Sequence, residues 1–311
     1  MLLRTLLIIL LISCLAESAC PPPEKIYPFC TCREEDRQSS MTCRNMQSFE
    51  DLLLPIQATV RRDMFSLHII NSSLLYIPNG LFQETNFKEI YLIQTEFTSF
   101  SDTDIAFDGL ENTLTKISIS GSKYVAQWEW SQLRNLQRIE SITINSTSMY
   151  SIDQTILVPN IIRLAITQSE VSFIYDEAFQ ALNKLLYMTL NENNIKVLKR
   201  SMFPKPCRLQ LLDLRKNQLR YLPGDLFEDM PEFLILRLDE NQFVTLNEKE
   251  FSLPMSKLAW FFMADNPLKC DCRMRWIVKS RKPPLFTASC SLPENLKGVN
   301  VKDLTVNQLW C

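Results

Sequence analysis

The sequence repeats one pattern of apolar residues along most of its length. The clearest copy, LQLLDLRKNQL at 209–219, has an apolar residue, others three, five and ten positions later, and a polar residue at the ninth position. Similar copies begin at Leu185, Phe233 and Leu258, so the period is 24, 24 and 25 residues. A fixed period of this length is typical of a solenoid, in which stacked repeats bury a core that no single repeat buries alone.

Weaker copies extend the pattern toward the N-terminus and bring the number of repeats to about nine. They span 64–74, 87–97, 114–124, 139–149 and 161–171. The apolar residues of a copy alternate with other residues, as in a strand with one buried face. The pattern predicts an α/β leucine-rich-repeat solenoid, or horseshoe. A parallel β-sheet lines its concave face, and short helices and loops form its convex face.

The ninth position of the repeat divides the solenoid into two halves. It is asparagine in the last four repeats and serine or threonine in the first five. Because a hydroxyl makes fewer hydrogen bonds than an amide, we expect the N-terminal half to be less regular. Phenylalanines that follow most repeats are expected to stack beneath the convex side: Phe82, Phe107, Phe179, Phe203, Phe227 and Phe251.

The first residues are typical of a secretory signal peptide. Arg4 precedes an apolar run from Leu6 to Leu15, which is too short to span a membrane as a helix, and Ala16 and Ala19 are small. No later stretch resembles a membrane span or a lipid anchor, so we expect a secreted, extracellular protein. The predicted divisions are a signal peptide (1–19), an N-terminal cysteine-rich cap (20–63), the repeats (64–265) and a C-terminal cysteine-rich cap (266–311).

Cysteines cluster at both ends of the expected mature chain. Without Cys14 of the signal peptide, nine of the 10 remain, four near each end and Cys207 between them. The expected export and the single histidine, His68, favour disulfides over metal sites. For Cys207 a buried free thiol and an intermolecular disulfide both stay open, and we favour the buried thiol.

The C-terminal cysteine segment carries a family resemblance. Its sequence, NPLKCDCRMRWIVKSRK followed by CSLPENLKG and LWC, looks like the C-terminal flanking domain of secreted leucine-rich-repeat proteins with cysteine-rich caps, and Cys30-Thr31-Cys32 is similar to their N-terminal cap. The resemblance covers essentially all of the mature chain. It implies the disulfides Cys20–Cys32, Cys30–Cys43, Cys270–Cys290 and Cys272–Cys311. Within the family, the architecture looks loosely like the non-catalytic subunit of a secreted shrimp luciferase, which implies a partner-binding or stabilising accessory protein.

One row of outward-facing side chains changes character halfway along the sheet. The third position of the repeat is polar or charged in the first five copies and apolar in the last four: Tyr187, Leu211, Ile235 and Trp260. Strands lie about 4.8 Å apart, so these side chains would form a strip about 15 Å long. We interpret it as a contact surface for an unidentified protein ligand or catalytic subunit. The alternative is that the C-terminal cap or local packing covers Trp260 and the others are ordinary surface residues.

Charged side chains lie beside this strip. Asp213 and Arg237 occupy the fifth position of their repeats, and Phe262 occupies it in the next repeat. Arg215 and Asp239 occupy the seventh position. Opposite charges therefore alternate on adjacent strands. Such pairs most often stabilise a sheet by about 0.2–1 kcal/mol each, and we prefer this interpretation to ligand binding.

Two N-x-[ST] sequons, Asn71-Ser72-Ser73 and Asn145-Ser146-Thr147, are candidate glycosylation sites at the ends of predicted strands. Glycans there would obstruct a protein partner in the N-terminal half, which favours binding in the C-terminal half. The alternative is that an ordered turn leaves one or both unmodified.

The C-terminal cap is basic. From Cys270 to Cys311, seven basic residues face three acidic ones, a balance of +4. This segment is a candidate for weak contact with an acidic glycan, with a solvated charged face as the alternative.

The sequence argues against an enzyme. It contains no G-x-S-x-G, no H-E-x-x-H and no glycine-rich phosphate loop, and His68 is expected to face solvent. Asp213 and Asp239 each have a basic neighbour, which should keep both ionised and unsuited to the acid role in a glycosidase. A net charge of −2 excludes strong attraction to nucleic acid.

The sequence therefore predicts a secreted, non-enzymatic binding protein that needs no metal or cofactor. Two alternatives stay open: a non-catalytic accessory subunit of a secreted enzyme complex, such as a luciferase or monooxygenase, and an extracellular-matrix component.

Overall fold

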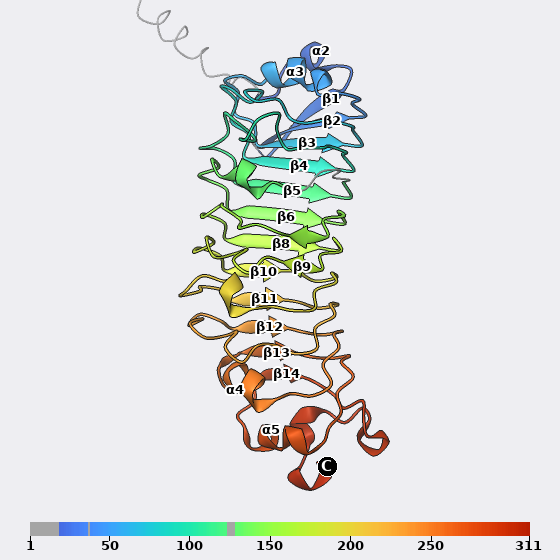
Figure 1. The fold of residues 1–311 in the computed structure, drawn as a ribbon. Coiled ribbons are helices and arrows are strands. Elements are labelled where there is room, and N and C mark those ends of the chain that lie inside the picture. The colour runs from blue at the N-terminus through green and yellow to red at the C-terminus, as the bar shows by residue number, and fades with distance from the viewer. Residues whose placement is uncertain (1–18, 37, 123–127) are drawn as a thin grey trace, which may run out of the picture.

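The computed structural model describes residues 19–36, 38–122 and 128–311, so the predicted signal peptide lies almost entirely outside the described residues. The repeats form one column that runs from cap to cap (Figure 1). Twelve strands make a single sheet along it, in which β1 and β2 are antiparallel and each later pair is parallel. The predicted parallel sheet of a solenoid is confirmed.

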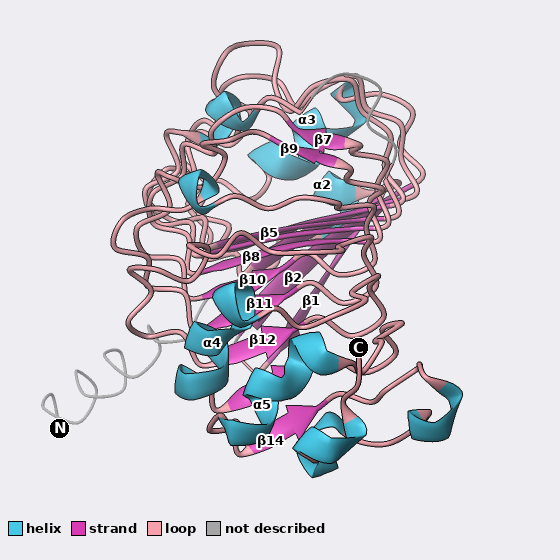
Figure 2. Cartoon of the chain, turned by 60° about the horizontal axis from the view of Figure 1, so that its bottom comes forward, coloured by secondary structure: helices cyan, strands magenta, loops and turns pink. Residues whose placement is uncertain are grey.

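The strands follow one another in the sheet in the order of the chain. They are β1 (Cys30–Glu35), β2 (Gln38–Arg44), β3 (Ser66–Ile70), β4 (Glu89–Ile93), β5 (Lys116–Ser120), β6 (Ser141–Asn145), β8 (Arg163–Thr167), β10 (Tyr187–Thr189), β11 (Leu211–Asp213), β12 (Ile235–Arg237), β13 (Trp260–Phe262) and β14 (Leu285–Thr287). A separate two-stranded sheet pairs β7 (Ser151–Ile152) with β9 (Phe173–Ile174), and Figure 2 shows it apart from the large sheet.

Short helical segments occur in the caps and in the connections between strands. They are α2 (Pro23–Ile26), α3 (Glu50–Gln57), η1 (Trp130–Leu133), η2 (Arg200–Met202), α4 (Glu248–Lys257), η3 (Cys272–Met274), α5 (Arg275–Lys279), η4 (Glu294–Leu296), η5 (Val301–Asp303) and η6 (Val306–Gln308). Among the described residues, no helix combines the length and apolar character needed to cross a membrane.

Alternation of side chains explains how each strand holds its place. In β5, Ile117 and Ile119 are buried, and the residues between and beside them are half-buried on the opposite face. Strands β4 and β6 repeat this pattern. The inward side chains of neighbouring repeats share one core, and the outward ones form a surface that we call the sheet face.

The expectation of a less regular N-terminal half is wrong for the sheet. Strands β3, β4, β5, β6 and β8 each contain five residues, whereas β10, β11, β12 and β13 contain three. The ninth-position residue accounts for the difference. The Nδ2 of Asn217 donates to the carbonyls of Leu214 and Arg215 in its own repeat, at 3.1 and 3.3 Å. These carbonyls turn toward the side chain directly after the strand ends.

The hydroxyls of the N-terminal repeats bind fewer groups but join neighbouring repeats in the same way. Ser122 Oγ accepts from the backbone N–H of Thr95 at 3.1 Å, and Thr95 Oγ1 donates to the carbonyl of Ile69 at 3.1 Å. All of these ninth-position residues are buried. Either chemistry therefore satisfies the backbone where the chain leaves the sheet.

A left-handed residue precedes the ninth position in every repeat, which the sequence did not predict. Its φ lies between 49° and 59° at Asn71, Gln94, Gly121, Ser146, Gln168, Glu192, Lys216, Glu240 and Asp265. Only one of these residues is a glycine, although glycine is the residue that adopts such a φ without strain. The left-handed residue could therefore be predicted from its place in the repeat, directly before the ninth position, but not from its residue type.

Four disulfides close the two ends. They pair Cys20 with Cys32, Cys30 with Cys43, Cys270 with Cys290 and Cys272 with Cys311, as the family resemblance implies. The first ties β1 to the chain before it, and the second joins β1 to β2 within the hairpin. The last two hold β14 and the end of the chain against the last repeat. The caps thus cover the apolar ends of the column, which would otherwise face water.

All six phenylalanines of the predicted convex stack are buried. Ring contacts join Phe82 to Phe107, with centroids 6.1 Å apart, and Phe179 to Phe203, at 5.6 Å. Beside Phe107, a cluster of other aromatic rings continues through Phe100, Trp128 and Trp130, with centroids 5.1 Å apart between the first two and 5.9 Å between the tryptophans. The repeat pattern did not predict this cluster.

Cys207 is a free, buried thiol, which is the alternative we favoured for it. Its side chain is 1% exposed, and burial raises its pKa. Nearby, Arg200 is 3% exposed and donates to the carbonyls of Glu228, Phe203 and Pro204 at 2.8, 3.2 and 3.0 Å. The guanidinium thereby holds together the loop that leads to Cys207.

Candidate functional site

The apolar row lies on the sheet face in one register. Tyr187, Leu211, Ile235 and Trp260 are paired neighbours on β10, β11, β12 and β13. The C-terminal cap does not cover Trp260, which is 47% exposed, and the other three are half-buried. The alternative in which the cap hides Trp260 is therefore wrong.

The cap instead lengthens the row. Its strand β14 places Leu285, 43% exposed, directly beside Trp260. Leu285 was not predicted as part of this row, although it follows Trp260 by 25 residues, the same spacing that separates Ile235 from Trp260. Five aligned apolar side chains form a strip roughly 19 Å long. We call these five residues, Tyr187, Leu211, Ile235, Trp260 and Leu285, the apolar strip.

A charged side chain marks the N-terminal end of the apolar strip. The guanidinium of Arg163 on β8 lies over the ring of Tyr187, 4.5 Å from its centroid. Beyond it the row continues with the charged residues Lys116 and Glu89. The strip therefore has a polar boundary at one end and the C-terminal cap at the other.

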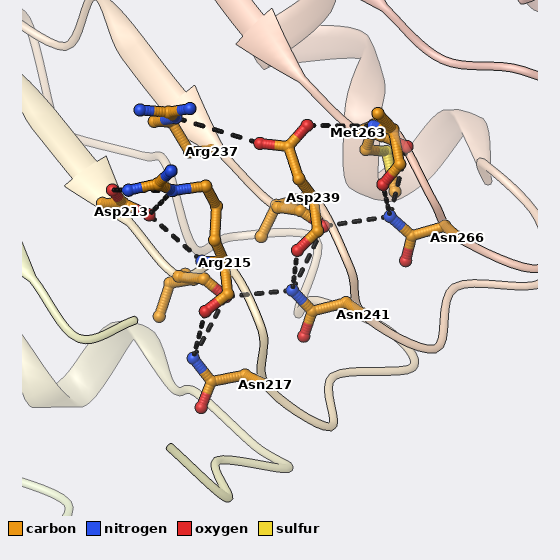
Figure 3. Close-up of polar contacts among 11 residues, drawn as sticks. Asp213, Arg215, Asn217, Arg237, Asp239, Asn241, Met263 and Asn266 are labelled. Carbon is orange, nitrogen blue, oxygen red and sulfur yellow. Dashed lines mark hydrogen bonds and ion pairs between the residues drawn. The ribbon is translucent and has the colours of Figure 1, made fainter. Parts of the chain in front are cut away.

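The charged residues beside the strip pair within their own repeats. Arg215 donates to both carboxylate oxygens of Asp213, with Nη2 to Oδ2 at 2.8 Å and Nε to Oδ1 at 2.9 Å (Figure 3). This hydrogen-bonded pair raises the pKa of Arg215. The predicted alternation of charges exists, but its closest contacts run along each repeat and not between adjacent strands, because side chains two residues apart point the same way.

The neighbouring pair, Arg237 and Asp239, is held less tightly. Arg237 Nε lies 3.8 Å from Asp239 Oδ2, beyond hydrogen-bond distance, and both atoms are buried without a hydrogen-bond partner. The guanidinium also lies over the ring of Phe262, 5.0 Å from its centroid. Asp239 accepts from the backbone N–H of Ala264 at 3.0 Å.

Burial changes the titration of Asp239. It raises the pKa of this carboxyl, and the hydrogen bond from Ala264 and the charge of Arg237 only oppose the shift. At Asp239 the cost of desolvating the carboxylate therefore outweighs the effect of its basic neighbour on the pKa.

Some basic residues of the C-terminal cap already interact with other groups of the protein. Arg273 pairs with Asp271 at 2.7 Å, and Arg275 Nε donates to the carbonyl of Leu309 at 2.9 Å. Asp271 holds a second cation, Lys269, at 4.0 Å. Fewer cations are free for an acidic glycan than the sequence count suggested.

The two sequons occupy different surroundings. Asn71 is exposed just after β3, and its Nδ2 donates to Asn45 Oδ1 at 2.7 Å. Asn145 ends β6, where its Oδ1 accepts from Thr167 Oγ1 at 2.8 Å. Across the described residues, no group of three or more His, Cys, Asp or Glu side chains is arranged to hold a metal ion.

Comparison with known proteins matches this architecture. The family profile described as Leucine rich repeat covers residues 159–219. Trophoblast glycoprotein of Mus musculus is 27% identical over 140 residues, which are 42% of this chain and 32% of that protein. The chain thus spans about a third of the length of this curated relative.

Three solved structures share the fold. Human 5T4 (Wnt-activated inhibitory factor 1, trophoblast glycoprotein) has a TM-score of 0.56 and 17% identity, over 96% of this chain and all of that one. The TLR13–ssRNA13 complex has a TM-score of 0.64 and 19% identity, over 73% and 32% of the two chains. The Drosophila Toll–Spatzle complex has a TM-score of 0.52 and 16% identity, over 80% and 45%.

Proposed function

Because the chain is a leucine-rich-repeat protein with disulfide-bonded caps, we propose that it is a secreted, non-enzymatic protein that recognises a protein partner through the apolar strip. The observation that carries the proposal is the alignment of five outward apolar side chains, two of them more than 40% exposed. A surface strip of this length in register is more than the scattered apolar residues of an ordinary surface.

The composition of the strip suits a protein better than a nucleic acid. Tyrosine and tryptophan dominate the energetics of protein interfaces, and Trp260 lies between Ile235 and Leu285. An RNA site requires a basic surface, whereas Arg215 and Arg237 beside the strip are paired with Asp213 and Asp239, and only Arg163, at the end of the strip, has no carboxylate partner among the described residues. Among the similar structures, Toll is in complex with Spatzle and TLR13 is in complex with ssRNA13. The strip favours a protein partner over an RNA for this chain.

The unsatisfied atoms of Arg237 and Asp239 lie next to the strip and add a polar element to it. A partner that shifts these side chains could complete hydrogen bonds that the free protein lacks. The proposed contact surface thus combines the apolar strip with Arg237, Asp239 and Phe262.

Replacing Ile235 and Trp260 together by serine is expected to weaken partner binding at least about thirtyfold, because central apolar anchors carry most of the energy of an interface. The measurement starts with protein purified unreduced from its natural source, by size exclusion with light scattering and mass spectrometry of co-eluting chains. Affinity of the identified partner for the wild type and the variant is then compared.

A matched control replaces Tyr221 and Val244 by serine. These side chains are 51% and 48% exposed but lie outside the apolar strip. A photo-crosslinker at Leu211 should capture the same partner that the double variant loses. Equal loss in the control, or a crosslink from Tyr221 and not from Leu211, would contradict the assignment of the strip.

The identity of the partner distinguishes the alternative functions. A catalytic chain that co-purifies would make this protein an accessory subunit, the role implied by the likeness to the shrimp luciferase subunit. Retention on polysaccharide that the double variant does not lose would point to a matrix component. A monomer that acquires a partner only when ligand is added is expected of a recognition protein.

We further propose that Asn71 and Asn145 carry N-linked glycans. Asn71 is exposed, whereas Asn145 is half-buried and the hydroxyl of its sequon, Thr147, is buried, so occupancy should be higher at Asn71. Peptide mapping by mass spectrometry before and after enzymatic removal of N-glycans measures both. Unmodified asparagine at both positions in the secreted protein would remove the argument that glycans obstruct the N-terminal half.

A further inference from the structure

The N-terminal cap carries a polar cavity on the sheet face, at the opposite end from the apolar strip. It has a volume of about 340 Å³ and is formed by outward side chains of β1 and β2. These are Thr31, Arg33 and Glu35 from β1, and Gln38, Ser40, Thr42 and Arg44 from β2. The antiparallel register sets Thr31 opposite Thr42 and Arg33 opposite Ser40, so both sides of the hairpin contribute to one hollow.

Two arginines of this cavity differ from the other cations of the sheet face. Lys116, Arg215 and Arg237 pair with carboxylates, and Arg163 lies over the ring of Tyr187. In contrast, the guanidinium groups of Arg33 and Arg44 are exposed and make no hydrogen bond or ion pair with the described part of the chain. Two unpaired guanidinium groups around one hollow have their donors free for an anion.

The side of the cavity toward the repeats is held by hydrogen bonds and a ring contact. Across β2 and β3, Ser40 is paired with Ser66 and Thr42 with His68. Ser66 Oγ donates to Ser40 Oγ at 2.8 Å and lies 3.0 Å from His68 Nε2. The imidazole stacks on Tyr91 with centroids 4.4 Å apart and an interplanar angle of 4°.

The sequence predicted that His68 faces solvent. In the structure its imidazole lies on the sheet face but is half-buried, in contact with Ser66 and Tyr91. Tyr91 is fixed in turn by hydrogen bonds to Glu89 and, at 2.8 Å, from Lys116. Burial lowers the pKa of His68; the charges of Arg44 and Lys116 lower it further, and only Glu89 opposes them. The imidazole thus senses the charge at the Arg44 side of the cavity.

We propose that this cavity binds an anionic saccharide that spans the hollow, with its carboxylate or sulfate group on Arg44 and its hydroxyls on Thr31, Ser40, Thr42 and the donors of Arg33. Guanidinium groups match the planar or multidentate oxygens of such anions, and the hydroxyl-rich lining suits sugar hydroxyls. Glu35 lies two residues from Arg33 on the same face, opposite Gln38 and at the end of the hollow away from Arg44, where it disfavours a second negative charge. A saccharide with one anionic group at its end fits better than a continuous polyanion.

The test uses His68 as its reporter, because the chain contains a single histidine and its imidazole signals need no assignment among others. The pKa of His68 is measured by NMR on the folded, disulfide-bonded chain, with and without an unsulfated disaccharide that carries one glucuronate carboxylate. A bound anion near Arg44 should raise this pKa saturably with disaccharide concentration. The same rise produced by NaCl at equal ionic strength would show screening only and overturn the proposal.

Variants assign the effect to the cavity. Arg33→Gln and Arg44→Gln should each weaken disaccharide binding about tenfold or more, since each removes charge-assisted hydrogen bonds. Arg44→Gln should also raise the pKa of His68 without ligand. The control Arg281→Gln, at an exposed position of the C-terminal cap, should bind as the wild type does. Unchanged affinity in both cavity variants, or loss in Arg281→Gln, would overturn the site.

Two further measurements separate this site from other possibilities. The Ile235→Ser, Trp260→Ser protein should bind the disaccharide normally, and loss in that variant would contradict the N-terminal location. Because the two sites are independent, failure here would leave the proposed function of the apolar strip intact. A pentaglutamate peptide that saturates His68 while the disaccharide has no effect would overturn the saccharide assignment in favour of an acidic protein segment.

Discussion

Replacing Arg200 by methionine is expected to lower the free energy of unfolding by about 3 kcal/mol, because three backbone carbonyls, two of them in buried hydrogen bonds, lose their donor at once. The side chain is 3% exposed and reaches the carbonyls of Phe203, Pro204 and Glu228 from separate nitrogens. Methionine fills a similar volume but donates no hydrogen bond. Denaturant unfolding with the disulfides intact measures the change as a lower midpoint.

Arg200→Lys separates the charge from the shape of the guanidinium. A single ammonium cannot reproduce the planar fork that serves three carbonyls in different directions, so this variant should also be destabilised. The control Arg208→Met removes an exposed arginine that pairs with Glu232 at 3.1 Å and should change stability by less than about 1 kcal/mol. If Arg200→Met lowers the denaturation midpoint no more than Arg208→Met does, then water can replace the guanidinium as the hydrogen-bond donor to the three carbonyls.

Replacing Asn217 by alanine is expected to cost a similar amount, about 3 kcal/mol, because one buried amide serves two repeats. Its Nδ2 donates to Leu190 of the preceding repeat at 2.9 Å, and its Oδ1 accepts from the backbone of Ile195 at 3.0 Å. Two more bonds close the turn of its own repeat. Alanine would leave these groups buried and unpaired.

Asn217→Ser should recover part of this loss, because serine occupies the same position in the N-terminal repeats and still makes two or three hydrogen bonds there. The order of stability is therefore wild type, then serine, then alanine, measured by the denaturation midpoint. Asn183→Ala is the control, since that exposed amide makes one bond of 3.4 Å. Serine and alanine variants of equal stability would show that hydroxyls do not replace the amide.

Sequence periodicity predicted the register of the sheet face well. The third-position residues Tyr187, Leu211, Ile235 and Trp260 do lie side by side, because a strand of each repeat pairs with the equivalent residues of the next. Leu285 escaped prediction because it belongs to the cap, where the repeat pattern has ended and only the spacing is kept. The repeat pattern therefore predicted four of the five residues of the apolar strip but not the fifth, Leu285 on β14.

Local contacts between side chains were beyond the reach of the pattern. The sequence places Asp213, Arg215, Arg237 and Asp239 on one surface, but it does not say that one pair forms a tight fork while the other stays 3.8 Å apart. Two contacts accompany that difference. The Arg237 guanidinium lies over the ring of Phe262, and Asp239 accepts a hydrogen bond from the backbone N–H of Ala264. Both come from the following repeat.

The sequence by itself determined the repeat, the direction of each strand and which residues face outward, because these follow from a period that every copy shares. The cysteine spacing, through the family resemblance, also gave the pairing of the caps. Only the tertiary structure decided which outward residues are free to bind. Whether Arg33 and Arg44 lack partners, and whether the cap covers Trp260, depends on distances between segments that no local pattern encodes.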